Sequence, residues 1–228
     1  MYPGGTCGGT LIKDNWVVTA AHCLATAKIA VAEIGDFTQK QPKLRTALGT
    51  MFIHEGYQID MTGNGPEVRS RAHDIALLKI SSSVPKQDVL PLCGDRSPRH
   101  SKLVAIGMGL NETWTNWDEI VERFENGAAV IPEVLQEVEL KENEDCFDRL
   151  PGLMGNPENQ ICCTNSEKKT ACNGDSGGPL VFVDSNNKAI CLYGLTSYGP
   201  LGCNKGLSVF TRVSKYQQWI TSTVAENS

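Results

Sequence analysis

The sequence predicts an all-β protein. Short runs rich in β-branched residues, such as 16–19 and 134–140, are separated by Gly, Asn and Asp, a pattern typical of strands joined by turns. The chain has 228 residues, and this length suits one large all-β domain or two small ones. Because 40% of the residues are hydrophobic, the chain can bury a sizeable core.

The expected elements follow one another along the whole chain. Short apolar runs predict a hairpin and later strands, at residues 7–12, 15–19, 75–80, 103–109 and 134–140. A short helix is expected within 117–124, and another begins near Asn143. From Val213 to Ile220, apolar residues recur at spacings of three and four, which predicts a C-terminal helix. The polar segments 56–72 and 110–128 are predicted to be long loops.

Charge and hydropathy argue against several classes of partner. The net charge of −5 is evidence against nucleic acid or an anionic membrane as the main partner. No apolar run reaches the roughly 18 residues that a membrane span needs. No apolar core follows Met1, so residues 1–12 are not a signal peptide, and we expect the signal of a secreted protein to lie upstream.

Nine cysteines in a chain of this size indicate an oxidising compartment, which favours a secreted, extracellular protein. They form no CxxC pair and no Cys/His ligand spacing, so zinc is the weaker interpretation and we expect no metal or cofactor. The odd number leaves one cysteine over.

Three segments far apart in the sequence carry residues suited to nucleophilic catalysis. His22 follows the strand at 15–19, and Asp74 leads into the apolar strand at 75–80. A carboxylate at that edge needs a partner, because burying a charge alone is costly. Ser176 lies among glycines, which permit a tight turn and close approach of a substrate. Such Gly/Asp/Ser turns are also common in β proteins, so the histidine and the aspartate decide the interpretation.

The other histidines compete with His22 for the role of general base. His54 and His100 are expected in surface loops, and His73 directly precedes Asp74. None of them has a setting comparable to that of His22.

These segments resemble the active-site segments of the chymotrypsin-like (trypsin-fold) serine proteases. The resemblance is carried by residues 7–12, 19–23, 74–78 and 174–179. The chain order histidine, aspartate, serine matches that family and differs from the order in subtilisin and in the α/β-hydrolases. A lipase-type esterase is excluded by this order and by the lack of a Gly-x-Ser-x-Gly elbow. The sequence departs from the family at His73, where asparagine is common.

The resemblance covers nearly the whole chain and implies its architecture. We expect one domain over residues 1–228, built from two antiparallel six-stranded β-barrels with a C-terminal α-helix. The two halves would be about 1–98 and 99–228. The catalytic residues would lie between the two barrels.

The resemblance also implies a secreted serine endopeptidase with an acyl-enzyme mechanism. Ser176 would be the nucleophile, His22 the general base, and Asp74 the residue that orients His22. The backbone N–H groups of Gly174 and Ser176 would form the oxyanion hole. Peptide or protein substrates and protease inhibitors are the expected partners.

Substrate contacts are implied for a further set of residues. Ser197 is expected to hydrogen-bond Asp74, and the backbone at 197–199 is expected to pair with the substrate as an added strand. The full substrate-binding set is Thr170, Ala171, Asn173, Ser197, Tyr198, Gly199 and Ser208.

The residues at the base of the implied pocket predict its specificity. Trypsin-like enzymes have an aspartate where Thr170 stands, so we expect an uncharged, small or apolar residue before the scissile bond, as in chymotrypsin and elastase. Two alternatives stay open. Gly206 could replace Ser208 in the pocket wall, or Lys205 could reach in and favour an acidic side chain.

The resemblance implies three disulfides, Cys7–Cys23, Cys146–Cys162 and Cys172–Cys203. Cys163 and Cys191 are then left over, and we expect them to bond each other. Cys93 lies where two-chain members of the family tether an upstream propeptide or regulatory segment. The alternative for Cys93 is a free buried thiol.

The start of the family's active form has no counterpart in this sequence. That form begins with an apolar residue whose ammonium pairs with the aspartate at Asp175, and we expect this start upstream of Met1. An unpaired Asp175 would rearrange rather than stay buried and charged. The chain alone would then be zymogen-like, or a non-catalytic homologue acting as an adaptor, although the intact triad argues against an adaptor.

Two further sites follow from local patterns. Asn111 begins the acceptor pattern for N-glycosylation that ends at Thr113. Asp36 is the one acid where the family's calcium loop would start, and residues 39–47 supply no carboxylate, so we expect no calcium site. The segment 56–72 would overhang the substrate cleft, with a plain surface insertion as the alternative.

Overall fold

The computed structural model describes residues 6–25, 31–35, 44–60, 67–70, 72–82, 84, 89–95, 98–111, 116–126, 132–150, 156–200 and 202–228. The elements in these ranges are β1 (Thr10–Lys13), β2 (Trp16–Thr19), α1 (Ala21–Ala25), β3 (Val31–Ile34), β4 (Leu44–Ile53), β5 (Gln58–Asp60), β6 (Glu67–Ser70), β7 (Ala76–Ile80), β8 (Lys102–Gly107), α2 (Trp117–Glu125), β9 (Gln136–Glu142), the 3-10 helix η3 (Glu144–Arg149), β10 (Gln160–Thr164), β11 (Pro179–Val183), β12 (Ala189–Tyr198), β13 (Leu207–Arg212), the 3-10 helix η4 (Val213–Tyr216) and α3 (Gln217–Glu226).

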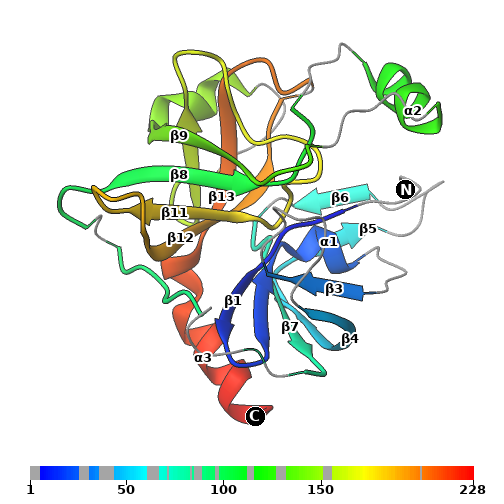
Figure 1. The fold of residues 1–228 in the computed structure, drawn as a ribbon, viewed down its shortest axis with the longest axis vertical. Helices are drawn as coiled ribbons and strands as arrows, with labels where there is room; N and C mark the ends of the chain where they lie inside the picture. Colours follow the sequence, from blue (N-terminus) through cyan, green and yellow to red (C-terminus); the bar gives the residue numbers. More distant parts are fainter. Residues whose placement is uncertain are drawn as a thin grey trace.

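The second half of the chain forms a closed six-stranded barrel. Its strands follow the order β10-β13-β12-β11-β8-β9, with antiparallel neighbours throughout (Figure 1). Each strand of the barrel therefore pairs with two neighbours, although β9 and β10 pair at only two residues. The mostly-β fold, the six-stranded barrel and the C-terminal helix were all predicted from the sequence, and the structure confirms them.

The first half forms a sheet of five strands in the order β1-β2-β7-β4-β3. This is one strand fewer than expected, and no sixth strand within the described ranges pairs with the outer edges of β1 and β3. The described residues therefore form an open sheet here, because closing a barrel requires both edge strands to be paired. In Figure 1 this sheet lies below the closed barrel.

The two long predicted loops contain regular structure. Within 56–72, strands β5 and β6 form a separate two-stranded sheet, where the sequence indicated a loop. Within 110–128, the predicted short helix is present as α2, which lies apart from both sheets in Figure 1. The polar composition of 56–72 hid the hairpin, because a two-stranded ribbon has no strongly apolar face to mark it.

One buried cluster joins the two halves. It contains Trp16 and Ile75 from the first half, Val104 and Leu192 from the second, and Ile220 from α3. The C-terminal helix leaves the closed barrel and runs down beside the first sheet (Figure 1). The shared cluster fixes the position of one half relative to the other, and with it the loops that meet between them.

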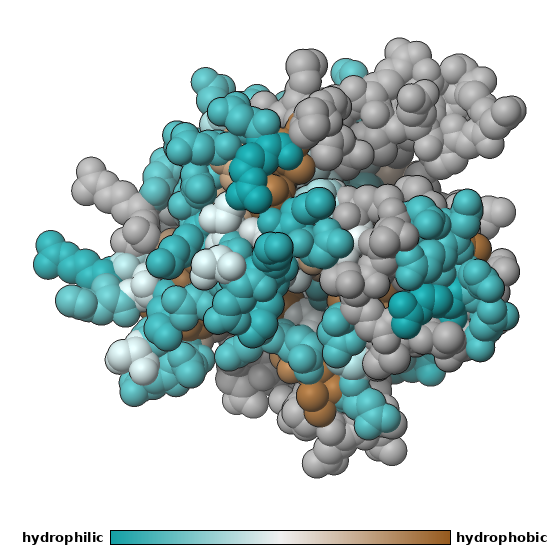
Figure 2. Space-filling model, turned by 90° about the horizontal axis from the view of Figure 1, so that it is seen from above, coloured by the Kyte–Doolittle hydropathy of each residue, from teal (hydrophilic) through white to brown (hydrophobic). Residues whose placement is uncertain are grey.

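The described residues on one face of the molecule are mainly polar. Figure 2 shows a face that is mainly hydrophilic, with hydrophobic residues confined to small separate patches. Within the described ranges, no helix is both long enough and apolar enough to cross a membrane.

Candidate active site

His22 and Asp74 lie beside two paired strands and meet in the first half. His22 lies in the short helix α1 directly after β2, and Asp74 precedes β7, the strand that pairs with β2. The His22 Nδ1–H donates to Asp74 Oδ2 over 2.8 Å, and the His22 backbone N–H donates to Asp74 Oδ1 over 2.9 Å. Two contacts to one carboxylate fix both the ring and the backbone of His22.

The Asp74 carboxylate is almost completely enclosed, with 3% of the residue exposed. Ser197 Oγ donates to its Oδ2 over 2.5 Å, and Thr211 Oγ1 donates to the Asp74 backbone carbonyl over 2.8 Å. Burial alone would raise the pKa of Asp74, but the His22 charge and the hydrogen bonds from His22 and Ser197 lower it on balance. The carboxylate is therefore held ionised beside the imidazole.

Ser176 lies on a tight turn that depends on glycine. Gly174 has φ +100° and Gly177 has φ +74°, values that L side chains rarely adopt. A Cβ on Gly177 would lie 2.1 Å from Thr19 Oγ1, so the turn also packs closely against the first half. The Gly8 N–H donates to the Ser176 carbonyl over 2.7 Å, which ties this turn to the segment before β1.

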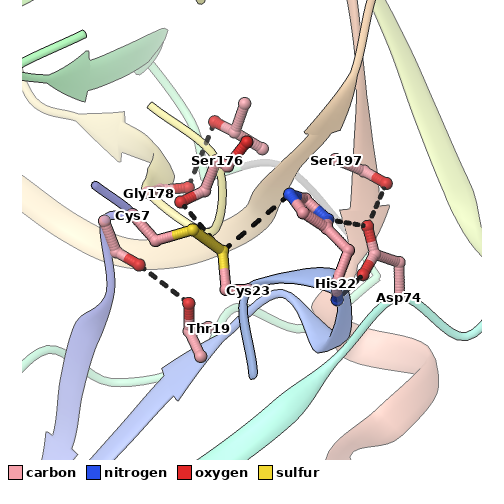
Figure 3. The surroundings of a disulfide bond; sticks show 10 residues. Cys7, Thr19, His22, Cys23, Asp74, Ser176, Gly178 and Ser197 are labelled. Carbon is pink, nitrogen blue, oxygen red and sulfur yellow. Dashed lines mark hydrogen bonds and ion pairs between the residues drawn. A yellow bond between two sulfur atoms is a disulfide. The ribbon is translucent and has the colours of Figure 1, made fainter. Parts of the chain in front are cut away.

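The Cys7–Cys23 disulfide brings Ser176 and His22 together (Figure 3). Cys23 Sγ lies 3.5 Å from the Ser176 carbonyl oxygen and 3.8 Å from His22 Nε2. A disulfide sulfur carries no proton, so the approach to the carbonyl is a packing contact and not a hydrogen bond. The Nε2 side of His22 therefore faces the Ser176 turn, while its Nδ1 side faces Asp74.

Two backbone N–H groups on the Ser176 turn differ from their neighbours. Those of Asp175, Gly177 and Gly178 donate to backbone carbonyls. By contrast, the backbone N–H groups of Gly174 and Ser176 donate to no backbone carbonyl of the described residues. These are the two groups that the sequence predicted as oxyanion donors.

Asp175 lies behind this turn in a close-fitting site. Its carboxylate accepts the N–H of Gly109 over 2.7 Å and the N–H of Cys172 over 2.8 Å. A Cβ added to Gly107 would lie 1.9 Å from Asp175 Oδ1, so the glycine leaves room for the carboxylate. Burial raises the pKa of Asp175, although the two backbone hydrogen bonds act in the opposite direction. Within the described part of the chain, no cationic side chain forms an ion pair with it.

The predicted pocket residues Thr170 and Ser208 face each other. Their hydroxyls share a short hydrogen bond, and Ser208 is 1% exposed. A Cβ on Gly199 would lie 3.8 Å from the Ser208 Cα, so Gly199 borders the same space. No carboxylate in the described ranges hydrogen-bonds either hydroxyl.

The two alternatives for the pocket wall lie elsewhere in the structure. Gly206 has φ +64°, and a Cβ there would meet the Asn165 carbonyl and Lys168. Lys205 is exposed, and its carbonyl accepts a hydrogen bond from Arg149 over 3.4 Å. Ser208, and not Gly206, is therefore the residue beside Thr170.

The remaining predicted substrate residues make contacts elsewhere in the second half. Ala171 packs against the buried cluster of the closed barrel, and the Asn173 carbonyl accepts the N–H of Leu110 over 2.9 Å. Tyr198 is buried, and its hydroxyl donates to Gln160 over 3.3 Å.

The structure contains the expected disulfides Cys7–Cys23, Cys146–Cys162 and Cys172–Cys203. The expected Cys163–Cys191 bond is wrong, because Cys191 bonds to Cys93. The segment before Cys93 runs beside β12: the Leu192 N–H donates to Pro91 and the Cys93 N–H donates to Leu192, each over 2.8 Å. This bridge brings the Cys93 and Cys191 Cα atoms to 5.1 Å.

Cys163 is the free cysteine, and it is buried. It lies on β10, which β13 separates from β12 in the barrel, so Cys163 cannot reach Cys191 by pairing across one strand. Burial raises the pKa of its thiol, which keeps the sulfur protonated and unreactive. Cys93 is engaged within the chain, so the predicted tether to an upstream segment through Cys93 is also wrong.

Some site residues were not found from the sequence. Thr211, which supports the Asp74 backbone, stands 137 residues away from it and carries no local signal. Gly107 and Gly109 flank one residue at the end of β8, and this spacing could have indicated a close backbone approach. Asn111 is exposed, but Thr113 and the segment 36–43 of the calcium prediction lie outside the described residues.

Comparisons with known proteins agree with this geometry. The family model "Trypsin" matches residues 2–220. The chain is 30% identical to proproteinase E of Bos taurus over 237 residues, covering 97% of this chain and 85% of that protein. It is 31% identical to chymotrypsin-like elastase family member 1 of Canis lupus familiaris over 235 residues, covering 97% and 82%.

A longer relative and a solved structure match as well. The chain is 30% identical to an ovochymase of Halocynthia roretzi over 231 residues, which are 95% of this chain but 13% of that protein. The structure of mouse neuropsin, described as a serine protease, matches with a TM-score of 0.73 and 26% identity, covering 96% of this chain and 88% of neuropsin.

The family model spans almost the entire chain, and the relatives align across both halves, including the segments that carry His22, Asp74 and Ser176. The closed barrel, the C-terminal helix and the disulfides agree with that match. The chain belongs to the trypsin family and is a serine endopeptidase of the trypsin fold.

Proposed function

We propose that this chain cleaves peptide bonds through an acyl-enzyme intermediate, with Ser176, His22 and Asp74 as the catalytic residues. The observation that carries the proposal is the Asp74–His22 hydrogen bond of 2.8 Å beside the Ser176 turn. Because the Nδ1 proton is held by Asp74, the Nε2 of the neutral ring is the nitrogen that can accept a proton.

The proposed reaction proceeds in two halves. Ser176 Oγ forms a bond to the scissile carbonyl carbon while its proton moves to His22 Nε2. His22 then gives that proton to the leaving amine as the peptide bond breaks. A water molecule, deprotonated by His22, attacks the acyl-enzyme, and the Ser176 hydroxyl is restored. Asp74 stabilises the imidazolium that forms in each half.

Two features support binding of the developing oxyanion and of the peptide. The N–H groups of Gly174 and Ser176, which donate to no backbone carbonyl of the described residues, are suited to bind an oxyanion, and losing one such donor typically costs about 10²–10³ in rate. Residues 197–199 extend past Leu195, the last residue of β12 that pairs with β11, so this edge can accept a substrate strand.

We infer that the residue before the scissile bond is uncharged and small or apolar. The hydroxyls of Thr170 and Ser208 bind each other at the pocket base, so neither presents a charge to a substrate Arg or Lys. Thr170→Asp should introduce a preference for Arg or Lys before the scissile bond. Thr170→Asn should not, because asparagine has the size of aspartate but no charge. Profiling with a peptide library would contradict the inference if the wild-type chain already cleaved after Arg or Lys.

We also propose that the protein is secreted. Four disulfides are typical of an oxidising compartment. Alkylation of the denatured natural protein without reductant should find one free thiol, at Cys163. Alkylation of all nine cysteines would contradict secretion.

The direct test of catalysis is reaction with a fluorophosphonate probe beside a Ser176→Ala control. Labelling that is lost in the control supports an assembled nucleophile. If neither protein is labelled although both unfold cooperatively, the chain is inactive in this form.

The alternative proposal, a zymogen-like chain or an adaptor, is favoured by one observation. Asp175 is buried without an ion-pair partner among the described residues, and burial raises its pKa. A short peptide with a free apolar N-terminus should then speed fluorophosphonate labelling by supplying a cation to Asp175. The same peptide with an acetylated N-terminus is the control. No labelling with either peptide would favour an adaptor.

A further inference from the structure

A cluster of aromatic side chains lies behind Asp74. His54 follows β4, His73 immediately precedes Asp74, and Tyr216 and Trp219 come from η4 and α3. The rings of His54 and His73 are stacked, with centroids 4.9 Å apart and planes at 5°. Tyr216 packs edge-on against both histidines, at 5.2 Å and 5.8 Å. Trp219 lies 5.1 Å from His54.

The backbone of His73 is unusual for its residue type. Its φ is +56°, in the left-handed region that non-glycine residues rarely adopt. The Ile75 N–H donates to the His73 carbonyl over 2.8 Å, and the His54 N–H donates to the Ile75 carbonyl over 3.2 Å. The turn that presents Asp74 is therefore bonded to the backbone of His54 as well as stacked on its ring.

The hydrogen bonds fix where His54 can carry a proton. The Gly56 N–H donates to His54 Nδ1 over 3.0 Å, so Nδ1 is an acceptor and the proton of the neutral ring lies on Nε2. A second proton on Nδ1 would point at the Gly56 N–H and open this turn. A Cβ on Gly56 would lie 2.7 Å from the His73 ring, so the turn also packs tightly against the stack.

The charged and titratable groups around the pair are few. Glu55 is the neighbouring carboxylate, 4.0 Å from His54 Nδ1, and its side chain is 79% exposed. The Tyr216 hydroxyl lies 3.2 Å from His73 Nδ1. The Asp74 carboxylate is bonded to His22 and Ser197. Burial lowers the pKa of His54, Glu55 raises it, and His73 lowers it, with a net lowering.

We propose that His54 and His73 are positioning residues for Asp74. The stacked rings hold the turn from which Asp74 reaches His22. A proton taken up at His54 Nδ1 opens the Gly56 turn, moves the His54 ring away from His73 and so weakens the Asp74–His22 contact. The inference rests on the proposed role of the Asp74–His22 pair, and it adds an acid-sensitive step outside the triad.

The sequence holds four histidines, so their ring signals can be followed one by one by NMR in chain labelled at histidine. We expect the His22 signal of the wild-type chain to titrate in two steps, its own and a second one as His54 takes up a proton. In His73→Asn the second step should be lost, because asparagine tolerates positive φ but offers no ring for His54 to stack on, so a proton on His54 no longer reaches the Asp74 turn.

His100 offers a matched control. It also has positive φ, at 53°, and it is exposed. His100→Asn should keep both steps of the His22 titration. Should His73→Asn fail to fold, His54→Phe keeps a stacking ring that cannot be protonated, and it should also show one step.

A one-step titration in the wild-type chain, or two steps that persist in His73→Asn or in His54→Phe, would overturn the inference. This NMR readout needs no catalysis. An inactive chain would therefore contradict the proposed function, while the role of His54 and His73 would still be decided by the titration. In active chain, kcat/KM below the pKa of His54 should fall about 100-fold per pH unit in the wild type and about tenfold in His73→Asn.

Discussion

The two halves of the molecule contribute to the site in different ways. In the first half, His22 and Asp74 lie next to the paired strands β2 and β7, in the five-stranded sheet that the described residues form. In the second half, Ser176 lies on a loop before β11 of a closed barrel, and disulfides hold both that loop and the outer segment at Cys93. The first half relies on strand pairing to position its residues, and the second relies on a glycine-dependent turn backed by Asp175.

This comparison indicates how substitutions in each half should affect catalysis and stability. The proposed acid–base pair, His22 and Asp74, depends on hydrogen bonds to one buried carboxylate, so single polar substitutions there should change catalysis more than stability. The nucleophile turn depends on close packing and covalent links, so substitutions there should change both.

The largest effect is expected for Asp74→Asn. The amide cannot hold the Nδ1 proton of His22 as the carboxylate does, so kcat should fall by about 10⁴. Steady-state kinetics at pH 8 would measure the change, and Asp148→Asn, at an exposed aspartate of the second half, should have no effect. A fall of less than tenfold would show that Asp74 does not orient the base.

Removal of the Cys93–Cys191 bond should have the next largest effect. The bond links residues 98 apart, so Cys93→Ala with Cys191→Ala should lower the free energy of unfolding by about 2–5 kcal/mol. The matched control is Cys163→Ala, which removes a buried free thiol from the same cluster and should cost about 1 kcal/mol. Equal midpoints in urea for the two variants would argue against the bond.

Gly107→Ala should disturb the second half through Asp175. Its Cβ would lie 1.9 Å from Asp175 Oδ1, so the carboxylate must move, and with it the Ser176 turn. We expect a loss of about 1–3 kcal/mol in stability and slower fluorophosphonate labelling. Gly94→Ala is the control, since its Cβ would meet no atom within 4 Å. Unchanged labelling in Gly107→Ala would show that the turn does not depend on this packing.

The smallest effect is expected for Ser197→Ala, which removes one hydrogen bond to Asp74. The pKa of Asp74 is lowered in the folded protein, so its stabilising contribution is present above its unfolded pKa and is lost as pH falls through the folded pKa. Ser197→Ala should raise that folded pKa, so acid unfolding should begin at a pH higher by about one unit or less. Ser101→Ala, which loses a bond to the Pro98 carbonyl, should leave the acid midpoint unchanged.

Much of the fold and the site could be predicted because the signals are local. The residues around His22, Asp74 and Ser176 each specify a strand end or a turn within a few positions, and the order of the three segments identifies the family. The hairpin within 56–72 was missed, because polar two-stranded ribbons lack an apolar pattern.

The pairing of cysteines far apart in the sequence was the other feature that sequence analysis predicted wrongly. Cys93 and Cys191 are joined because the segment ending at Cys93 runs beside β12, and no residue pattern near either cysteine encodes that alignment.

The sequence by itself indicated the candidate catalytic segments around His22, Asp74 and Ser176, and its resemblance to a known family implied three of the disulfides. Only the tertiary structure decided that Cys93 bonds Cys191 and leaves Cys163 as a free thiol. It also decided how Thr170 meets Ser208 and how His54 stacks on His73 behind Asp74. The physical reason is that turns and strands follow from neighbouring residues, whereas contacts across the barrel depend on strand register and on packing between distant segments.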